Sequence, residues 1–421
     1  MNPKVRRAVI IAALCVFVIT VFLIFLNTAG VPITNIRYVF SQKPELPNRD
    51  LGEKKITADR ESVVMTRGYD ALEDDLKEVY ETVGEYINKT GSEMFWINCS
   101  HEDFIRVHRA YLTDHPEVFW LTTDGAGYRY GEYDGGVSIE YRFSFDGDYL
   151  DEMKEELSKR VEKIMSDAPG EASDYELELY FNEYLTKTVS YDEEKSSPMR
   201  GNPYGALIYG RVVCAGYSTA FQLLCNRAGI ECSSVYGYIT NTDGEGNNAE
   251  KNDLHQWNCV KIEGDWYYTD VTWNDNSNGT SAHAYFNITA DEIKRTRSFN
   301  PFYEDDPEWN DTYFNYFAPE CDSKEYNYYQ KTGAEITDLE DDTEILAVIM
   351  DAAKQKKPTV DLRVSDSLDY ESTVESVAKI YAFRWIEGVN YYNGNDPSVI
   401  PPTQLFYYKK THCIVLNLDY R

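Results

Sequence analysis

A cysteine in the middle third of the chain has the surroundings that thiol chemistry needs. Cys214 follows the β-branched pair Val212-Val213, and the run Ala215–Arg227 after it consists of good helix formers. The sequence therefore predicts Cys214 at a helix N-terminus, where unpaired backbone amides and the helix dipole favour the thiolate. The same amides would receive a developing oxyanion. The alternative is a small buried residue, the usual fate of a free cysteine.

A histidine and an aspartate lie in two stretches that predict a β-hairpin. His255 belongs to LHQWNCV and Asp270 to WYYTDVTW, and the turn signal Glu263-Gly264-Asp265 lies between them. Asp270 stands in an otherwise apolar and aromatic strand, where an ionised group is seldom found without a partner. His255 alone could be an ordinary core or surface histidine, but a carboxylate on the neighbouring strand favours a pair.

The length of the turn decides whether these two side chains can meet. With a loop of Glu263-Gly264, Asp270 faces Trp257 and His255 faces Thr272. His255 and Asp270 are then diagonal neighbours on one face, about 7–8 Å apart. A loop of Gly264-Asp265 keeps that face, whereas a three-residue loop puts Asp270 on the opposite one.

Together the three residues predict nucleophilic catalysis by a thiol. Cys214 would be the nucleophile, His255 the general base and later acid, and Asp270 the group that orients and stabilises the imidazolium. Such a site attacks a peptide or carboxamide carbonyl and forms a thioester, which passes to water or to an amine. A metal site is a weaker interpretation, because Cys214, His255 and Cys259 lack paired CxxC spacing, and we expect neither a metal nor a cofactor.

The stretches that carry these residues resemble a known family. VCAGYSTAFQLLCNRAGI, HQWNCVKIEGDWYYTDVTWND and the YFNI that follows are similar to the transglutaminase-like superfamily, whose core is related to papain-type cysteine hydrolases. With upstream Tyr191-Asp192 and Tyr204–Leu207, the resemblance covers about Ser173–Ile288. It implies an α+β fold in which a Cys-bearing helix packs on an antiparallel sheet that carries the His and the Asp. It also implies a membrane-anchored bacterial surface protein.

Other residues near the three have less specific interpretations. Trp257 and Trp273 could wall the site and Asn258 could support it, or all three could be core packing. Tyr204 is a candidate for completing the oxyanion hole. Cys225 and Cys232 could pair across a helix end, although the eight cysteines are too dispersed for a dense disulfide scaffold.

The elements predicted around the site place it between two smaller α+β units. We predict helices at Asp75–Tyr86, Glu102–Leu112, Tyr149–Met165, Ser173–Leu185, Glu344–Lys354 and Tyr370–Phe383, and strands at Met94–Cys99, Val137–Phe145, Cys232–Ile239, Thr359–Val364 and Cys413–Leu418. The predicted domains are a cytoplasmic stub (1–7), an anchor (8–28), a stalk (29–60), an N-terminal α+β unit (61–148), a transglutaminase-like domain (149–325) and a C-terminal α+β unit (326–421).

The N-terminal segment predicts the cellular location of the protein. Ala8–Leu26 is a stretch of nineteen residues without a charge, preceded by the basic residues Lys4, Arg6 and Arg7. It is long enough to span a membrane as a helix, with the basic end in the cytoplasm and the rest of the chain outside. The alternative is a cleaved signal peptide, for which Leu26-Asn27-Thr28-Ala29 offers a poor cleavage site.

The charge of the chain narrows the classes of partner that the protein is expected to bind. A formal net charge of −30 repels phosphate backbones and argues against nucleic acid. We expect a protein or peptide substrate at the cell surface, or cell-wall material. The competing hypothesis is a non-catalytic surface module that binds a partner and uses the same fold as a scaffold.

Overall fold

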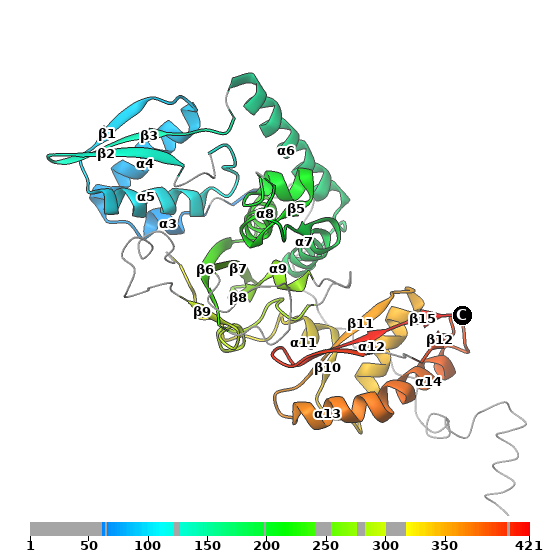
Figure 1. Ribbon diagram of the computed structural model, residues 1–421. Helices are drawn as coiled ribbons and strands as arrows, with labels where there is room; N and C mark the ends of the chain where they lie inside the picture. Colours follow the sequence, from blue (N-terminus) through cyan, green and yellow to red (C-terminus); the bar gives the residue numbers. More distant parts are fainter. Residues whose placement is uncertain are drawn as a thin grey trace, which may run out of the picture. The chain divides into compact units, whose positions relative to one another are not determined.

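The computed structural model describes residues 61–63, 65–121, 127–145, 147–197, 199–240, 254–275, 283–299, 317–401 and 405–421. These residues form two compact units of mixed α+β architecture (Figure 1). The larger unit comprises the described residues up to Thr332 together with Tyr408–Cys413, and the smaller comprises Gly333–Tyr407 and Ile414–Arg421.

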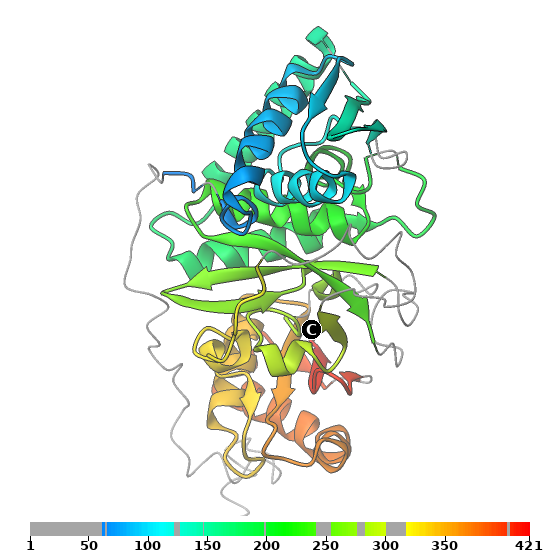
Figure 2. The ribbon, with the colours of Figure 1, turned by 90° about the vertical axis from the view of Figure 1, so that its left-hand side faces the viewer.

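The central layer of the larger unit is a four-stranded antiparallel sheet of order β8-β7-β6-β9. Its strands are β6 (Cys232–Ile239), β7 (Leu254–Ile262), β8 (Asp265–Thr269) and β9 (Arg297–Phe299). Helix α8 (Cys214–Arg227) packs on β6 and β7, and α7 (Asp174–Thr188) packs beside α8. Figure 2 shows this helical layer over the sheet. The first four residues of β6 are buried, as expected of a strand covered on both faces.

The predicted helix and the strand after it are confirmed. Helix α8 begins at Cys214 and ends at Arg227, and β6 runs over the predicted residues Cys232–Ile239. Gly229 ends the helix with a positive φ of 78°, which a residue with a side chain rarely adopts. Its close approach to Glu61 adds a second reason for glycine, since a Cβ there would lie 2.7 Å from the Glu61 carbonyl oxygen.

The register of the predicted hairpin is confirmed, but its second strand is shorter than expected. Ile262 pairs with Asp265 across the loop Glu263-Gly264, and the pairing continues to Asn258 and Thr269. The chain then leaves the ladder, because Asp270 caps the short helix α9 (Val271–Asn274). The predicted pairing of His255 with Thr272 is therefore wrong, since Thr272 lies in this helix.

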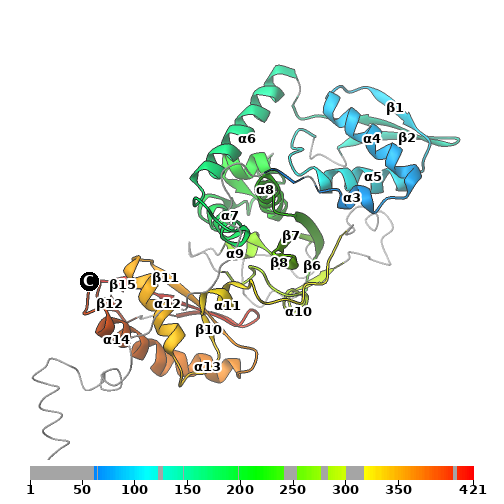
Figure 3. The same ribbon diagram turned by 180° about the vertical axis from the view of Figure 1, so that it is seen from behind.

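The elements before residue 145 form a helical pair on a small sheet. Helices α4 and α5 pack together over the sheet β1-β3-β2, and Figure 3 shows both from behind. Strand β3 alternates between buried and half-buried residues, so only one face is covered. The hairpin partner of β3, β2, was not predicted. The elements are α3 (Arg67–Asp70), α4 (Asp74–Lys89), β1 (Met94–Ile97), α5 (His101–Asp114), β2 (Tyr128–Tyr133) and β3 (Gly136–Tyr141).

These elements share one hydrophobic core with the helix that bears Cys214. A continuous cluster of buried side chains runs from Leu72 in the N-terminal part to Tyr326. A buried hydrogen bond of 2.8 Å from Gln222 Nε2 on α8 to the Thr113 carbonyl oxygen fixes α5 against α8. The N-terminal elements are thus positioned relative to Cys214 by direct packing.

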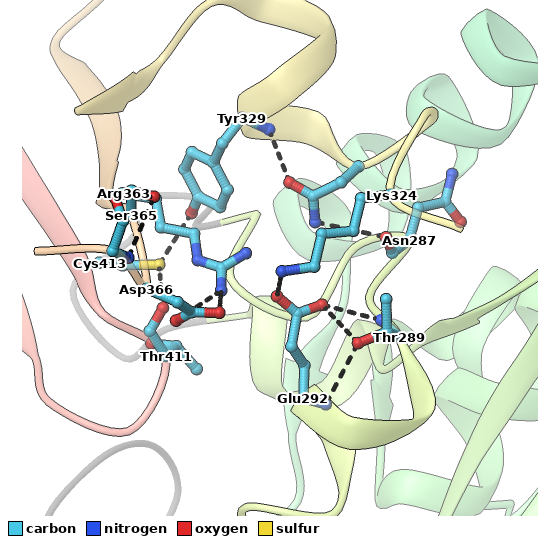
Figure 4. A network of polar contacts seen from close by, with 12 residues as sticks. Asn287, Thr289, Glu292, Lys324, Tyr329, Arg363, Ser365, Asp366, Thr411 and Cys413 are labelled. Carbon is cyan, nitrogen blue, oxygen red and sulfur yellow. Dashed lines mark hydrogen bonds and ion pairs between the residues drawn. The ribbon is translucent and has the colours of Figure 1, made fainter. Parts of the chain in front are cut away.

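The remaining segments of the larger unit complete its layers. Thr289 and Glu292 form a capping box at α10, and Lys324 lies 3.4 Å from a Glu292 carboxylate oxygen (Figure 4). These segments are α6 (Gly147–Asp167), β4 (Ser190–Tyr191), η2 (Gly205–Tyr209), β5 (Arg211–Val212), α10 (Ala290–Ile293) and α11 (Tyr328–Thr332).

The smaller unit is built on a second sheet, of order β10-β11-β14-β13, with the separate pair β12-β15. The predicted strand Thr359–Val364 is confirmed as β11, and the predicted helix from Tyr370 continues through a π-helical turn to Tyr392. The elements are β10 (Glu335–Ile336), α12 (Thr343–Lys354), β11 (Thr359–Val364), α13 (Tyr370–Ser376), η3 (Val377–Tyr381), α14 (Ala382–Tyr392), β12 (Val399–Ile400), β13 (Leu405–Tyr408), β14 (Cys413–Asn417) and β15 (Asp419–Tyr420).

No helix within the described ranges is both long and apolar enough to cross a membrane. The predicted stub, anchor and stalk, including the apolar stretch Ala8–Leu26, lie outside the described residues.

Candidate active site

Cys214 is the first residue of α8, as predicted, and its side chain is half-buried. No side chain caps the start of this helix, and the amides of Gly216 and Tyr217 donate to the Val213 carbonyl oxygen, so the amides of Cys214 and Ala215 are the ones available to a ligand. The preceding residue is fixed by a 2.9 Å hydrogen bond from the Val213 amide to the Arg200 carbonyl oxygen. Gly216 is needed here because a Cβ would lie 2.7 Å from that same oxygen.

The structure brings His255 and Asp270 into direct contact. His255 Nε2 lies 2.7 Å from Asp270 Oδ2, and the exposed fractions of the two side chains are 3% and 0%. The thiol of Cys214 forms a hydrogen bond with the same imidazole. We refer to Cys214, His255 and Asp270 as the Cys-His-Asp cluster.

Asp270 is held by more than one donor. Its Oδ1 accepts a 3.3 Å hydrogen bond from the Trp273 amide at the start of α9, while Oδ2 receives His255. A third donor, Arg297 Nη2, also lies 2.7 Å from Oδ2 and is itself fully buried. The carboxylate therefore has one oxygen fixed by the backbone and the other shared between two cationic side chains.

The electrostatics of the cluster favour a thiolate paired with an imidazolium. Burial alone would raise the pKa of the Cys214 thiol, but the hydrogen bond and the charge of His255 outweigh it, so the pKa lies below its ordinary value. Burial likewise disfavours the charged imidazole, yet the charge and hydrogen bond of Asp270 raise the pKa of His255 to about 9. For Asp270, the charges of His255 and Arg297 outweigh burial and hold the pKa below its usual value.

Aromatic rings enclose the imidazole. The Trp257 ring lies nearly parallel to it with 6.0 Å between centroids, and the Trp273 ring meets it edge-on at 6.3 Å. Both tryptophans therefore border the imidazole and are also buried in the core, so the structure agrees with both interpretations that the sequence left open. Asn258 supports the site indirectly, because its side-chain amide donates to the Ser218 carbonyl oxygen at 3.1 Å and joins β7 to α8.

A buried glutamate holds the end of β8, next to Asp270. Glu178 of α7 contacts the Thr269 hydroxyl at 3.2 Å and accepts a hydrogen bond from Asn287 Nδ2 at 2.7 Å. Its exposed fraction is 0%, and burial raises the pKa of its carboxyl group to about 8. This acid is therefore largely neutral at neutral pH, in contrast with Asp270.

A cavity of about 300 Å³ adjoins the start of α8. Ala215 and Gln256, the neighbours of Cys214 and His255 in the chain, contribute to its lining. The other wall comes from the N-terminal elements. Its lining includes Leu112 and Phe119 on that side, and Asn202, Thr219 and Gln256 on the opposite side.

The geometry also bears on two weaker predictions. The hydroxyl of Tyr204, the candidate for completing the oxyanion hole, donates its proton to Glu156 on α6 in this structure. Cys225 and Cys232 are both free and buried, with their thiols in hydrogen-bond contact. Within the described ranges, no group of three or more His, Cys, Asp or Glu side chains is arranged to hold a metal ion.

The residue that the sequence did not indicate is Arg297. It lies in a run, Lys294-Arg295-Thr296-Arg297, where three of four residues are cationic. Nothing in the local pattern distinguishes the buried arginine from its exposed or half-buried neighbours. Its proximity to Asp270 comes from the pairing of β9 with β6, in which Arg297 lies opposite Ile239.

Part of the chain is similar to known proteins. Residues 161–271, which include all three members of the cluster, match the family model of the transglutaminase-like superfamily. Kyphoscoliosis peptidase of Mus musculus is 28% identical over 118 residues, covering 27% of this chain and 18% of that protein. Kyphoscoliosis peptidase of Homo sapiens is 34% identical over 61 residues, covering 14% and 9% respectively. The matches thus span less than a fifth of either peptidase.

Two solved structures are also similar to part of the chain. One is a crystal structure of a TGase, with a TM-score of 0.24 and 14% identity, covering 34% of this chain and 43% of that one. The other is a candidate cysteine protease from Cytophaga hutchinsonii, with a TM-score of 0.23 and 16% identity, covering 34% and 61%.

Proposed function

We propose that the protein is a thiol enzyme that attacks peptide or carboxamide bonds through Cys214, His255 and Asp270, which all lie within the residues 161–271 that match the transglutaminase-like family model. The observation that carries this proposal is the Cys-His-Asp cluster, in which a half-buried thiol at the uncapped start of α8 meets a buried His-Asp pair. A purely structural cysteine needs neither a histidine partner nor a carboxylate behind it.

The proposed reaction begins with the thiolate of Cys214. Its sulfur attacks the carbonyl carbon, and the amides at the start of α8 stabilise the negative oxygen. The His255 imidazolium gives its proton to the departing amine, which leaves a thioester on Cys214 and a neutral imidazole. His255 then takes a proton from water or from an acceptor amine as that nucleophile attacks the thioester, and the thiolate is released.

The cavity beside α8 supports the binding of an extended substrate. It borders Ala215 and Gln256, and it is about as large as the smaller ligand sites of proteins. Asn202 adds a polar group to its lining, and its side-chain oxygen is fixed by a 3.0 Å hydrogen bond from the Gly205 amide. A substrate chain in this cavity would bring an amide bond close to Cys214.

Thiol labelling of the full-length protein tests the proposal. At pH 6.5 we expect iodoacetamide to label wild type rapidly at Cys214, because its thiolate persists below the range in which an ordinary thiol ionises. Burial raises the pKa of Cys99 to about 11 and that of Cys321 to about 12, so these thiols should stay silent. Cys214→Ala should abolish the labelling, whereas Cys225→Ala, a matched change of a buried thiol, should not.

His255→Gln adds a check on the mechanism. Without the imidazolium, Cys214 should require a higher pH for the same labelling rate, by about one unit or more. Equal labelling of wild type and Cys214→Ala would contradict the proposed function. A peptide-hydrolysis assay and an amine-incorporation assay, run side by side, separate a hydrolase from an acyl transferase.

Membrane anchoring and an outward-facing site are a separate part of this proposal and are supported by the sequence of residues 1–30 alone. Adding a protease to intact cells should degrade the part of the chain that carries Cys214 while the bilayer remains closed. Protection of that part from the protease would contradict the outward location.

A non-catalytic surface module is the second candidate. A specific observation favours the enzyme over it: Asp270 and Arg297 are both fully buried next to His255, an arrangement that costs desolvation without helping a binding surface.

A further inference from the structure

Arg297 is a fully buried cation beside the Cys-His-Asp cluster, and its contacts are specific. Its Nη2 lies 2.7 Å from Asp270 Oδ2, and its Nη1 donates to the Thr296 carbonyl oxygen at 3.2 Å. The guanidinium carbon lies 4.0 Å from the centre of the Trp273 ring and 5.1 Å from that of Tyr285. The planar group is therefore fixed by an ion pair, a backbone acceptor and two aromatic rings.

Such a residue is too costly to be incidental. A buried arginine loses its hydration, and its guanidinium remains charged at any pH that proteins tolerate. Packing alone would be served equally well by an apolar side chain of similar size. The one anion it contacts among the described residues is the carboxylate that also receives His255 Nε2.

We propose that Arg297 is a positioning residue of the site: its guanidinium shares the Asp270 carboxylate with His255 and thereby sets the proton balance of the imidazole. The inference builds on the proposed function only in its consequence for catalysis. The geometric claim stands on contacts among β7, β9 and the start of α9.

The groups that control the imidazole are few. Among the described residues, those acting on His255 are Cys214 from α8, Asp270 from the end of β8 and Arg297 from β9. Cys214 and Asp270 favour the imidazolium, whereas the positive charge of Arg297 opposes it. Arg297 thus counteracts part of the effect of the carboxylate that it holds in place.

This opposition has a use in the second half of the proposed reaction. Once Cys214 is a thioester, its negative charge is gone and His255 must be neutral to accept a proton from water or an amine. With Asp270 as its only charged neighbour, the imidazole would keep its proton to a higher pH and would deacylate poorly near neutrality. The cation of Arg297 lowers the pKa of the imidazole and so favours the neutral base that deacylation needs.

Direct titration of His255 tests the inference without requiring activity. Full-length protein with Cys214→Ala removes the thiolate, so that Asp270 and Arg297 remain as the charges around the imidazole. The protein carries histidine labelled with ¹³C in the ring, and His255→Gln identifies the His255 signal among the six histidines. Two further variants are added singly: Arg297→Gln keeps a donor to Asp270 but loses the charge, and Arg297→Lys keeps the charge.

The expected result is a higher titration midpoint for His255 in Arg297→Gln, by about one pH unit, and a midpoint close to the parent in Arg297→Lys. An unchanged or lower midpoint in Arg297→Gln would overturn the inference. Using two polar replacements instead of an apolar one limits the risk that the protein fails to fold, and Arg297→Gln alone decides the direction of the shift.

A kinetic measurement links the titration to function. With Cys214 present, p-nitrophenyl acetate should give a burst from acylation followed by slow deacylation. In Arg297→Gln we expect the acid limb of the deacylation rate to move to higher pH by the same amount as the His255 midpoint, with the burst retained. A uniform loss of rate without a shift of that limb would mean that Arg297 only supports the structure. A wild type without any Cys214-dependent burst would contradict the proposed function, whereas the titration would still decide the role of Arg297.

Discussion

At the scale of residues, the surroundings of two neighbouring buried carboxyl groups, Asp270 and Glu178, shift their pKa values in opposite directions. Asp270 is surrounded by an imidazole, a guanidinium and a backbone amide, and its pKa is held low. Glu178 has neutral hydrogen-bond partners in Thr269 and Asn287, and burial, with a smaller contribution from the charge of Asp174, raises its pKa to about 8. The sequence indicated Asp270 because a carboxylate is unusual in a strand of aromatic residues. It offered no such sign for Glu178, which lies in a helix rich in glutamate.

Glu178 makes stability depend on pH in a direction that can be worked out. Its pKa rises from 4.5 in the unfolded chain to about 8 in the folded protein, so the folded state binds the extra proton between these values. The free energy of unfolding should therefore fall as pH rises through that window, by an amount on the order of 3–4 kcal/mol.

Glu178→Gln should remove this dependence. The side-chain amide that the substitution introduces can donate to Thr269 Oγ1 and accept from Asn287 Nδ2, in the same way as the neutral acid. Urea unfolding followed by tryptophan fluorescence should show near-equal stabilities around pH 5 and a more stable variant at pH 9. Glu162→Gln, an exposed change on α6, is the control and should follow wild type. Parallel pH curves for wild type and Glu178→Gln would contradict the argument.

At the scale of elements, a helix start and a strand end create the site. Helix α8 presents Cys214 at its uncapped N-terminus, and β8 stops at Thr269 so that Asp270 can cap α9. Had β8 continued in the ladder, Asp270 would have faced Trp257 at a diagonal from His255. Leaving the ladder instead lets the carboxylate approach the imidazole to 2.7 Å.

Gly237 controls how closely β9 approaches β6 and hence where Arg297 lies. It pairs with His255 on one side and with Phe299 on the other. A Cβ there would lie 1.9 Å from the Ser298 carbonyl oxygen and 2.7 Å from the Trp257 ring. Gly237→Ala should therefore push β9 outward and destabilise the protein by about 2 kcal/mol or more.

Urea unfolding measures this loss, and Gly170→Ala is its control, because a Cβ at Gly170 meets nothing within 4 Å. Iodoacetamide should also alkylate Cys214 more slowly at pH 6.5 in the Gly237→Ala variant, because the displaced β9 disturbs the Cys-His-Asp cluster. A Gly237→Ala protein as stable as Gly170→Ala would rule out the close approach.

At the scale of the whole molecule, the N-terminal elements contribute to the site as well as to the core. Their side chains join the hydrophobic cluster around α8, and Leu112 and Phe119 line the cavity that Ala215 of α8 borders. A substrate in that cavity would contact residues within 161–271 on one side, and α5 and the segment after it on the other.

Filling the cavity from the N-terminal side should block the access of a large substrate without changing the reactivity of the Cys214 thiol. Leu112→Arg places a long cation in the cavity, so hydrolysis of dye-labelled casein, or amine incorporation into casein, should fall by about tenfold or more. Iodoacetamide is small, and its labelling of Cys214 should be unchanged. Tyr130→Arg, on an exposed β2 position of the same elements, is the matched control. Equal loss of casein turnover in both variants would argue against the cavity as the substrate site.

The sequence by itself determined the local features. Helix and strand periodicity, the Gly229 stop and the two-residue turn depend on neighbours in the chain, and the structure reproduces α8, β6 and the hairpin register. The motifs also led to the superfamily through residues that lie within 161–271.

Tertiary structure alone decided the rest. The close contact of His255 with Asp270 required β8 to end at Thr269, before the predicted pairings of Asp270 and Thr272 could form. Arg297 reaches the Asp270 carboxylate because β9 pairs with β6, which is distant in sequence. The sequence alone does not show which of the neighbouring cations would be placed there. The wall of the cavity required α5 to pack on α8. Each of these arises from long-range contacts between apolar surfaces, whose geometry no local pattern encodes.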